Sequence, residues 1–394
     1  MPIITDQEAL ERACAAWARA PHLAVDTEFL REKTYYPKLC LIQVAAPAGG
    51  RAAAVDPLAS GIRDLAPLMA LLHDPAITKV FHAAKQDLEI VFHMTGRLPA
   101  PVFDTQVAAM VCGYGEQVGY EALVAKVTGA AVDKGAQFTD WSRRPLSDKQ
   151  VAYALGDVTH LLEVYDALLR QLDRRGRAGW ITEEDAALAD PALYEFRPEE
   201  AWRRLKVRNP KAKNLVVLRA LAAWREREAQ RADRPRGWIL RDEALTELAT
   251  RLPRSMEEIS ALRGIPPSFR DGSKGKTVLA LMEEALATPQ KTWPQPERKA
   301  PMDAEAAERL ELFKMLRKMH AARLGVAPHI LSSSDDLRDL AIHGEGADIP
   351  LLRGWRLAES GQEMLDLASG RLAIGLQDGK IQAMRVTQRG TASS

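Results

Sequence analysis

Hydrophobic and polar positions follow two periods in the first 180 residues. A period of two is typical of strands, and it predicts five short ones, at Ala24–Phe29, Leu39–Ala45, Ala52–Asp56, Ile77–His82 and Val102–Asp104. Runs with helical spacing follow the later strands, at Ala84–Met94 and Asp148–Asp173. Tyr35-Tyr36-Pro37 and Gly49-Gly50 mark the turns between the first three strands. A meander of strands followed by β-α-β alternation predicts a mixed α/β sheet.

Beyond Trp180 the strand pattern fades, and residues 201–288 and 303–370 have the spacing of helices joined by short turns. Four prolines interrupt the chain between these blocks, and proline cannot sustain a helix. The pattern therefore predicts an α/β domain, two helical domains, a proline-rich linker and a C-terminal tail, disordered from Thr387. Their expected ranges are 1–200 for the α/β domain, 201–288 and 303–376 for the helical domains, 289–302 for the linker and 377–394 for the tail.

The overall net charge of +1 hides a strong asymmetry. Residues 1–200 contain 20 Lys and Arg against 28 Asp and Glu, a net charge of −8, whereas residues 201–300 contain 22 against 12, a net charge of +10. This division predicts chemistry on the first part and polyanion binding on the second. A solvated basic surface is the alternative. The candidate phosphate-binding residues are Arg203, Arg204, Lys206, Arg208, Lys211 and Lys213.

Several functional classes are not supported by the sequence. No run approaches the ~18 apolar residues of a membrane span, and the N-terminus has no signal-peptide pattern. Three widely spaced cysteines suit a reducing cytoplasm. The segment Asp271–Lys276 leads into a helix, but it lacks the spacing of a Walker A loop because residue 270 is Arg. We therefore expect a cytoplasmic protein without a membrane or nucleoside-triphosphate partner.

Acidic residues lie on one of the predicted strands and shortly after another. Asp26 and Glu28 are two apart on a strand, so they share a face. Paired carboxylates of this kind either bind a divalent metal or mark a strand end in solvent. Asp87 follows a strand-to-helix turn, at the sheet edge where sites collect in α/β proteins. The alternative for Asp87 is an exposed residue stabilised by the helix dipole.

Tyr153 and Asp157 are four apart on a predicted helix and so share a face. Taken alone, Tyr153 is also compatible with a packing role and Asp157 with a surface charge. Together the four carboxylates carry a formal charge of −4, which two Mg²⁺ ions would neutralise. Two such ions can activate water and stabilise the leaving oxygen of a phosphodiester.

This ordered set resembles the DEDD-type 3′→5′ exonucleases, and specifically the bacterial ribonuclease D family. Further similar segments follow in the same order, namely Val25–Phe29, Thr34–Leu39, Asp104–Gln106, Thr139–Trp141 and Arg144–Leu146. The resemblance covers essentially the whole chain. It implies a ribonuclease-H-like mixed-sheet exonuclease domain followed by two all-α HRDC-type (helicase and ribonuclease D C-terminal) domains.

Carried over position by position, the resemblance implies the site residues. The metal ligands for two divalent ions, Mg²⁺ or Mn²⁺, would be Asp26, Glu28, Asp87 and Asp157. Tyr153 would orient the attacking water. Related enzymes have a His five residues before the last Asp, where this chain has Ala152, so it is similar to the tyrosine subclass. A phenol with a pKa near ~10 is a poor general base at neutral pH.

Three further residues lie beside the acidic motifs. Phe29 and His82 either line the groove for the terminal nucleotide or belong to the packing, and Asp104 is expected to be a helix N-cap. The resemblance implies a monomeric 3′→5′ exoribonuclease that releases nucleoside 5′-monophosphates and trims the 3′ ends of tRNA precursors. A DNA-directed exonuclease and a non-catalytic RNA-binding protein are the alternatives.

Overall fold

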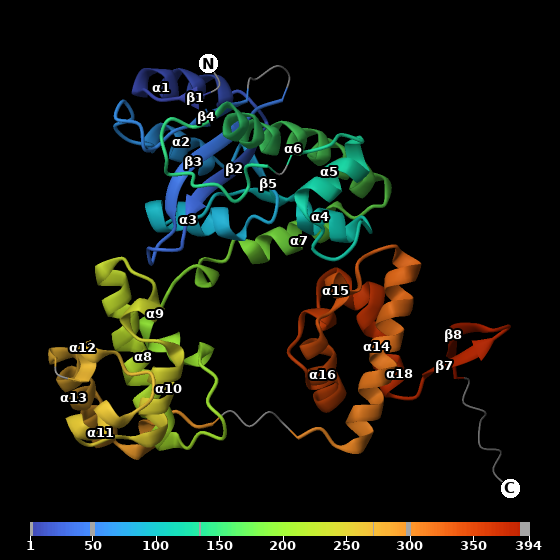
Figure 1. Cartoon of the computed structure of the whole chain (residues 1–394). Coiled ribbons are helices and arrows are strands. Elements are labelled where there is room, and N and C mark those ends of the chain that lie inside the picture. Colours follow the sequence, from blue (N-terminus) through green and yellow to red (C-terminus); the bar gives the residue numbers. More distant parts are fainter. Residues whose placement is uncertain (1–2, 48–51, 134, 271, 297–300, 387–394) are drawn as a thin grey trace, which may run out of the picture.

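The computed structural model describes residues 3–47, 52–133, 135–270, 272–296 and 301–386. An α/β domain is followed by two helical domains, which lie side by side below it in Figure 1. The expected turn at Gly49-Gly50, Asp271 of the segment before a helix, residues 297–300 of the expected linker and residues 387–394 of the expected tail lie outside this description. Within it, no helix is both long enough and apolar enough to cross a membrane.

A six-stranded sheet of order β1-β4-β3-β2-β5-β6 forms the centre of the α/β domain. β3 is antiparallel to β2 and β4, whereas the other neighbouring pairs are parallel. The mixed sheet and the five predicted strands are confirmed, and a two-residue strand, β1, is added at one edge. The strands are β1 (Ile3–Ile4), β2 (His22–Leu30), β3 (Lys38–Ala45), β4 (Ala53–Val55), β5 (Thr78–Phe81) and β6 (Val102–Asp104).

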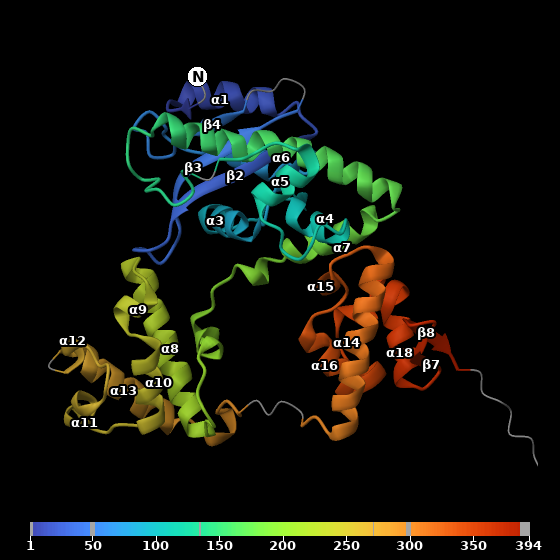
Figure 2. The same ribbon diagram turned by 45° about the vertical axis from the view of Figure 1, so that its right-hand side comes forward.

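Helices cover both faces of this sheet because its strands are apolar on both. Leu23 and Val25 face a core with the first three helices, whereas Ala24 faces a core with the next four. The first set is α1 (Gln7–Trp17), α2 (Ala66–Leu72) and α3 (Lys85–Thr95). The second is α4 (Thr105–Val111), α5 (Tyr120–Thr128), α6 (Asp148–Arg174) and α7 (Ala178–Leu188). The long α6 lies over β2 and β3, which brings its side chains to the middle of the sheet (Figure 2).

The first helical domain has its own apolar core and begins within the second of two short 3₁₀ turns, whose Ala201 belongs to that core. The turns are η1 (Pro191–Leu193) and η2 (Pro198–Arg204). The helices are α8 (Ala212–Ala232), α9 (Arg236–Ile239), α10 (Asp242–Arg251), α11 (Met256–Ala261), α12 (Pro267–Arg270) and α13 (Ser273–Ala287), with η3 (Gln290–Thr292) after them. It joins the α/β domain through the β2–β3 loop, where Asp233 accepts hydrogen bonds from the backbone N–H groups of Tyr35 and Tyr36 at 3.0 and 3.1 Å.

The second helical domain packs directly on the α/β domain. Trp180 of α7 stacks on Trp355 with ring centroids 4.0 Å apart, and Arg356 pairs with Glu184 at 2.6 Å. Its α-helices are α14 (Ala304–Leu324), α15 (Pro328–Leu331), α16 (Ser334–His343), α17 (Gly354–Arg356) and α18 (Gln362–Ala368). The 3₁₀ turns η4 (Gly344–Gly346) and η5 (Pro350–Leu352) and the π-helical segment η6 (Leu357–Gly361) lie between them.

The C-terminal part of this domain differs from the expectation. In place of an all-helical domain to residue 376 and a tail from 377, β7 (Leu372–Gln377) and β8 (Lys380–Arg385) form an antiparallel hairpin. Asp378 and Gly379 form its turn with positive φ angles of 52° and 74°. Positive φ at both positions is what a type I′ turn requires, and Asp-Gly favours it. The Asp-Gly pair and the alternation of the preceding strand were therefore the signal that the sequence analysis missed.

Candidate active site

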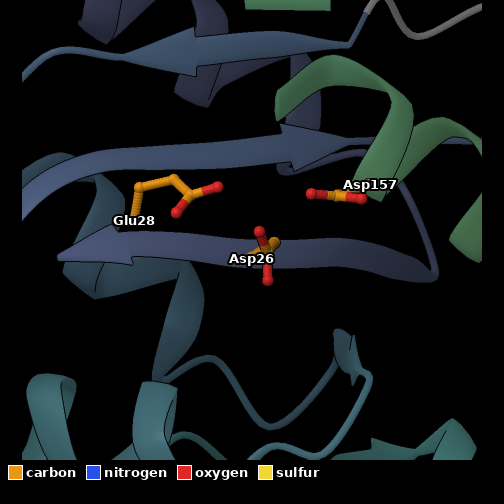
Figure 3. A group of neighbouring side chains, drawn as sticks. All are labelled: Asp26, Glu28 and Asp157. Atoms are coloured by element: carbon orange, nitrogen blue, oxygen red, sulfur yellow. The ribbon is translucent and has the colours of Figure 1, made fainter. Parts of the chain in front are cut away.

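Three carboxylates form a cluster on one face of the sheet. Asp26 and Glu28 project from β2, and Asp157 descends on them from α6 (Figure 3). One oxygen of each lies within 4.8 Å of the other two, and Asp157 is buried while the others are half-buried. The structure thus brings together three of the four carboxylates expected as metal ligands.

Local sequence explains why these side chains converge. Asp26 and Glu28 share one face of β2 because side chains of a strand alternate. The helix that carries Asp157 begins with a capping box, in which Ser147 and Gln150 satisfy each other's backbone N–H groups. The hydroxyl of Tyr120 then donates to the carbonyl oxygen of Asp157 at 2.7 Å and anchors the helix at this point.

The cluster is electrostatically unfavourable without a cation. Burial and then the charge of Asp26 raise the pKa of Glu28 to about 10, and burial raises the pKa of Asp157 to about 7. The pKa of Asp26 is raised well above its usual range by burial and by Asp157. No Lys or Arg of the described part of the chain forms an ion pair with any of the three. Hard oxygen donors without a basic partner fit a Mg²⁺ or Mn²⁺ ion.

Asp87 lies apart from the other three. It sits in the first turn of α3, on the face of the sheet toward which Thr27 points, and it accepts a hydrogen bond of 2.5 Å from the Thr27 hydroxyl. Asp26 is still near enough to raise the pKa of Asp87, after the larger effect of burial. Asp87 is therefore a buried neighbour of the cluster, and Thr27 is a positioning residue that the sequence analysis missed.

Tyr153 lies one helical turn before Asp157, and its phenol is near enough to lower the pKa of the Asp157 carboxylate. Burial, followed by the charges of Asp157 and Glu28, raises the pKa of the Tyr153 phenol. The phenol therefore stays protonated at neutral pH and can donate a hydrogen bond, but it cannot take a proton from water.

The other residues beside the acidic motifs are also placed. His82 is half-buried, with its ring nitrogens 3.0 Å from the Thr105 hydroxyl and 3.1 Å from the carbonyl oxygen of Val118. These contacts favour packing over substrate contact for His82. Phe29 is half-buried at a bulge in β2. Asp104 is the N-cap of α4 and also accepts from the N–H groups of Ala83 and Ala84, so its predicted capping role is confirmed.

The basic run lies in the first helical domain, and all six of its side chains are exposed. Arg203 pairs with Glu200, and Arg204 lies 3.8 Å over the ring of Phe196. No ion pair forms within the described residues at the other four positions, which are Lys206, Arg208, Lys211 and Lys213. These four charges are free to bind phosphates.

The carboxylate cluster generates a prediction about metal-free stability. A carboxyl group whose pKa is higher in the folded chain favours folding in its protonated form, so its contribution is present below pH ~4 and lost as the pH rises through the folded pKa. This stabilising contribution is therefore lost between pH ~4 and about pH 7 for Asp157, and between pH ~4 and about pH 10 for Glu28. Asp26→Asn removes one of the repelling charges. In EDTA, its melting temperature should exceed that of the wild type at pH 8.5, and the difference should shrink at pH 5.5.

The same pair of proteins measures the response to metal. Added Mg²⁺ or Mn²⁺ should raise the melting temperature of the wild type more than that of Asp26→Asn, because a bound ion stabilises only the state that binds it. Differential scanning fluorimetry measures both melting temperatures. Leu23→Ala, which disturbs the same strand without touching the charges, should lose stability at every pH and keep the metal response. An equal metal response in wild type and Asp26→Asn would contradict an ion at this cluster.

Comparisons with known proteins agree with this geometry. Residues 1–173 match the family model of the 3′-5′ exonuclease, and residues 214–281 match the HRDC domain. The chain is 42% identical to ribonuclease D of Sphingobium indicum and 44% identical to that of Gluconacetobacter diazotrophicus, over 98% and 96% of both chains. The crystal structure of Escherichia coli RNase D is similar with a TM-score of 0.81 at 32% identity, over 93% of this chain and 98% of that one. The chain belongs to the ribonuclease D family of 3′→5′ exoribonucleases.

Proposed function

We propose that this exoribonuclease is metal-dependent and that Asp26, Glu28, Asp87 and Asp157 hold two divalent ions, Mg²⁺ or Mn²⁺. The convergence of three of these carboxylates within 4.8 Å is the observation that supports it. Asp87 would contribute through its proximity to Asp26. When bound, such ions acidify a water and stabilise the charge that develops on the leaving oxygen of a phosphodiester.

The chain's own groups supply the rest of the chemistry. Tyr153 keeps its proton and would orient the attacking water by donating a hydrogen bond. Thr27 holds Asp87 by donating to its carboxylate, and Tyr120 holds the helix turn that carries Asp157. The products would be nucleoside 5′-monophosphates, released one at a time from the 3′ end.

We further propose structured RNA precursors as substrates, tRNA 3′ trailers in particular. The similar E. coli enzyme is described as an exoribonuclease involved in structured RNA processing, which supports this substrate class. The protein would act as a cytoplasmic monomer. DNA and a purely binding role are the alternatives, and a nuclease assay separates them.

The primary test uses a tRNA precursor with a 3′ trailer and a 5′ label. We expect the wild type to produce a ladder that shortens from the 3′ end in Mg²⁺ or Mn²⁺ but not in EDTA. Asp26→Asn should reduce kcat by at least about 1,000-fold, because several kcal/mol of transition-state charge stabilisation is lost. A 5′-labelled single-stranded DNA of equal length tests the DNA alternative. Tight RNA binding without any ladder would favour the non-catalytic one.

Tyr153→Phe separates orientation from proton transfer. It deletes one hydrogen bond, worth about 1.5 kcal/mol, so kcat should fall only about tenfold. The pH dependence of kcat should keep its shape, because the phenol does not titrate near neutrality. A loss as large as that of Asp26→Asn, measured on the same RNA, would mean that Tyr153 does more than orient water.

The unpaired basic residues of the first helical domain generate a prediction about affinity. A variant with Gln at Lys206, Arg208, Lys211 and Lys213 should bind single-stranded RNA with a weaker salt dependence. The slope of log K against log salt should decrease by about 0.7 for each phosphate that is no longer neutralised. Fluorescence anisotropy measures it in the full chain, because deleting the helical domains would expose Trp180, which stacks on Trp355.

The matched control has Gln at four exposed arginines of the α/β domain, Arg12, Arg19, Arg63 and Arg97. It removes the same charge from a surface outside the basic run and should leave the slope nearly unchanged. Equal slopes for wild type and both variants would remove the basic run from the RNA-binding surface.

A further inference from the structure

A cavity of about 680 Å³ lies between the α/β domain and the first helical domain. One wall is formed by the β2–β3 loop and the start of α3, and it includes Arg31, Tyr36 and Lys85. The facing wall includes Arg204 and Arg241. In both Figure 1 and Figure 2 the first helical domain approaches the α/β domain beside this loop.

The two walls are held at a defined separation by a hydrogen-bond network. The Tyr35 hydroxyl donates to Glu226, which is fully buried, and Arg236 donates to both carboxylate oxygens of Glu226 at 2.8 Å. Asp233 also accepts from the backbone N–H group of Tyr35. The cavity is therefore a feature of the folded interface rather than a gap between loosely tethered domains.

The cavity presents unneutralised positive charge from both walls. Arg31 is paired with Glu89, and Arg236 is paired with Glu226. Lys85, Arg204 and Arg241 are exposed and form no ion pair within the described residues. Of the acidic lining residues, which are Glu89, Asp242 and Glu243, the first two are already paired. Within the described residues, three unpaired cations therefore face one unpaired carboxylate, Glu243, which leaves a net positive charge for an anion with several charges.

The cavity is also close to the carboxylate cluster along the chain. Arg31 follows Glu28 by three residues, which is about 10 Å on an extended strand. Lys85 precedes Asp87 by two residues at the start of α3. A nucleic-acid strand whose 3′ end lies at the carboxylates would therefore have its next phosphates within reach of this cavity.

We propose that this cavity is a subsite for single-stranded RNA immediately upstream of the nucleotide being removed. Lys85, Arg204 and Arg241 bind its phosphates, and the ring of Tyr36, which is 36% exposed, offers a stacking surface for one base. The inference rests on the proposed metal-dependent hydrolysis, since the metal site defines where the 3′ end lies. It makes the interface between the two domains part of the substrate path.

The test compares RNA lengths in the full-length double variant Arg204→Gln/Arg241→Gln. Lys85 is left unchanged because it is two residues from Asp87. For a 5′-labelled octanucleotide, KM should rise roughly tenfold with little change in kcat, because two cations that bind phosphates are removed. For a dinucleotide, which is too short to reach the cavity, KM should rise much less. An equal rise for both lengths, or no rise for either, would overturn the proposal.

Two controls separate charge from folding. Arg204→Lys/Arg241→Lys keeps both charges and should restore most of the octanucleotide affinity. Arg254→Gln removes an exposed charge of the same domain that does not line the cavity, and it should behave as wild type. The lysine variant could instead bind the octanucleotide as poorly as the glutamine variant, with both melting temperatures equal to that of the wild type. That result would contradict the proposal that these residues bind phosphates.

A binding measurement keeps the subsite distinguishable from catalysis. In an Asp26→Asn background, anisotropy with the octanucleotide should show a Kd increase of roughly tenfold for Arg204→Gln/Arg241→Gln. Absence of metal-dependent hydrolysis by the wild type, together with this loss of binding, would contradict the proposed function but not the cavity as an RNA site. Hydrolysis by the wild type without any loss of binding in the variant would contradict the cavity alone.

Discussion

Mutual repulsion among three carboxylates that are buried or half-buried is the constraint on which the rest of this structure depends. Asp26, Glu28 and Asp157 would separate if their backbones were free to move, because like charges in a poorly hydrated site repel strongly. The fold prevents this by placing two of them on β2, which has a paired strand on each side, and the third on α6, which lies across the same strands. The rigidity of the sheet thus preserves a site whose charge is neutralised either by protons, as the raised pKa values of these groups indicate, or by a bound cation.

Neighbouring polar groups complete that framework. Thr27 lies between Asp26 and Glu28 on the same strand, and its hydroxyl donates to Asp87 and holds that carboxylate as a neighbour of the cluster. Tyr120 holds the backbone of α6 at Asp157. Asp104 caps α4 and accepts from the residues that lead into α3, so it couples the start of the Asp87 helix to the sheet edge. These groups contact no reacting atom, but they determine where the carboxylates can be.

The charge asymmetry of the chain has a spatial counterpart. The α/β domain is acidic and would repel a polyanion, whereas the first helical domain is basic. The β2–β3 loop links the two, because it continues from the strand that carries Glu28 and docks onto Glu226 and Asp233. The basic domain is therefore attached through the loop that follows the strand with two of the carboxylates, and the cavity between the domains begins at Arg31, directly after that strand.

Periodicity and residue type were sufficient to predict the strands, the long helix α6, the shared strand face of Asp26 and Glu28 and the capping role of Asp104. These are local properties, because a strand face or a helix turn is determined by the spacing of a few residues. Contacts between distant segments decided the rest. Asp87 bonds to Thr27, and His82 lies within hydrogen-bond distance of Thr105 and Val118. Arg204 and Arg241 line the same cavity as Lys85. All of these contacts depend on how separate elements meet. No periodicity encodes such contacts, since their partners lie tens to hundreds of residues apart.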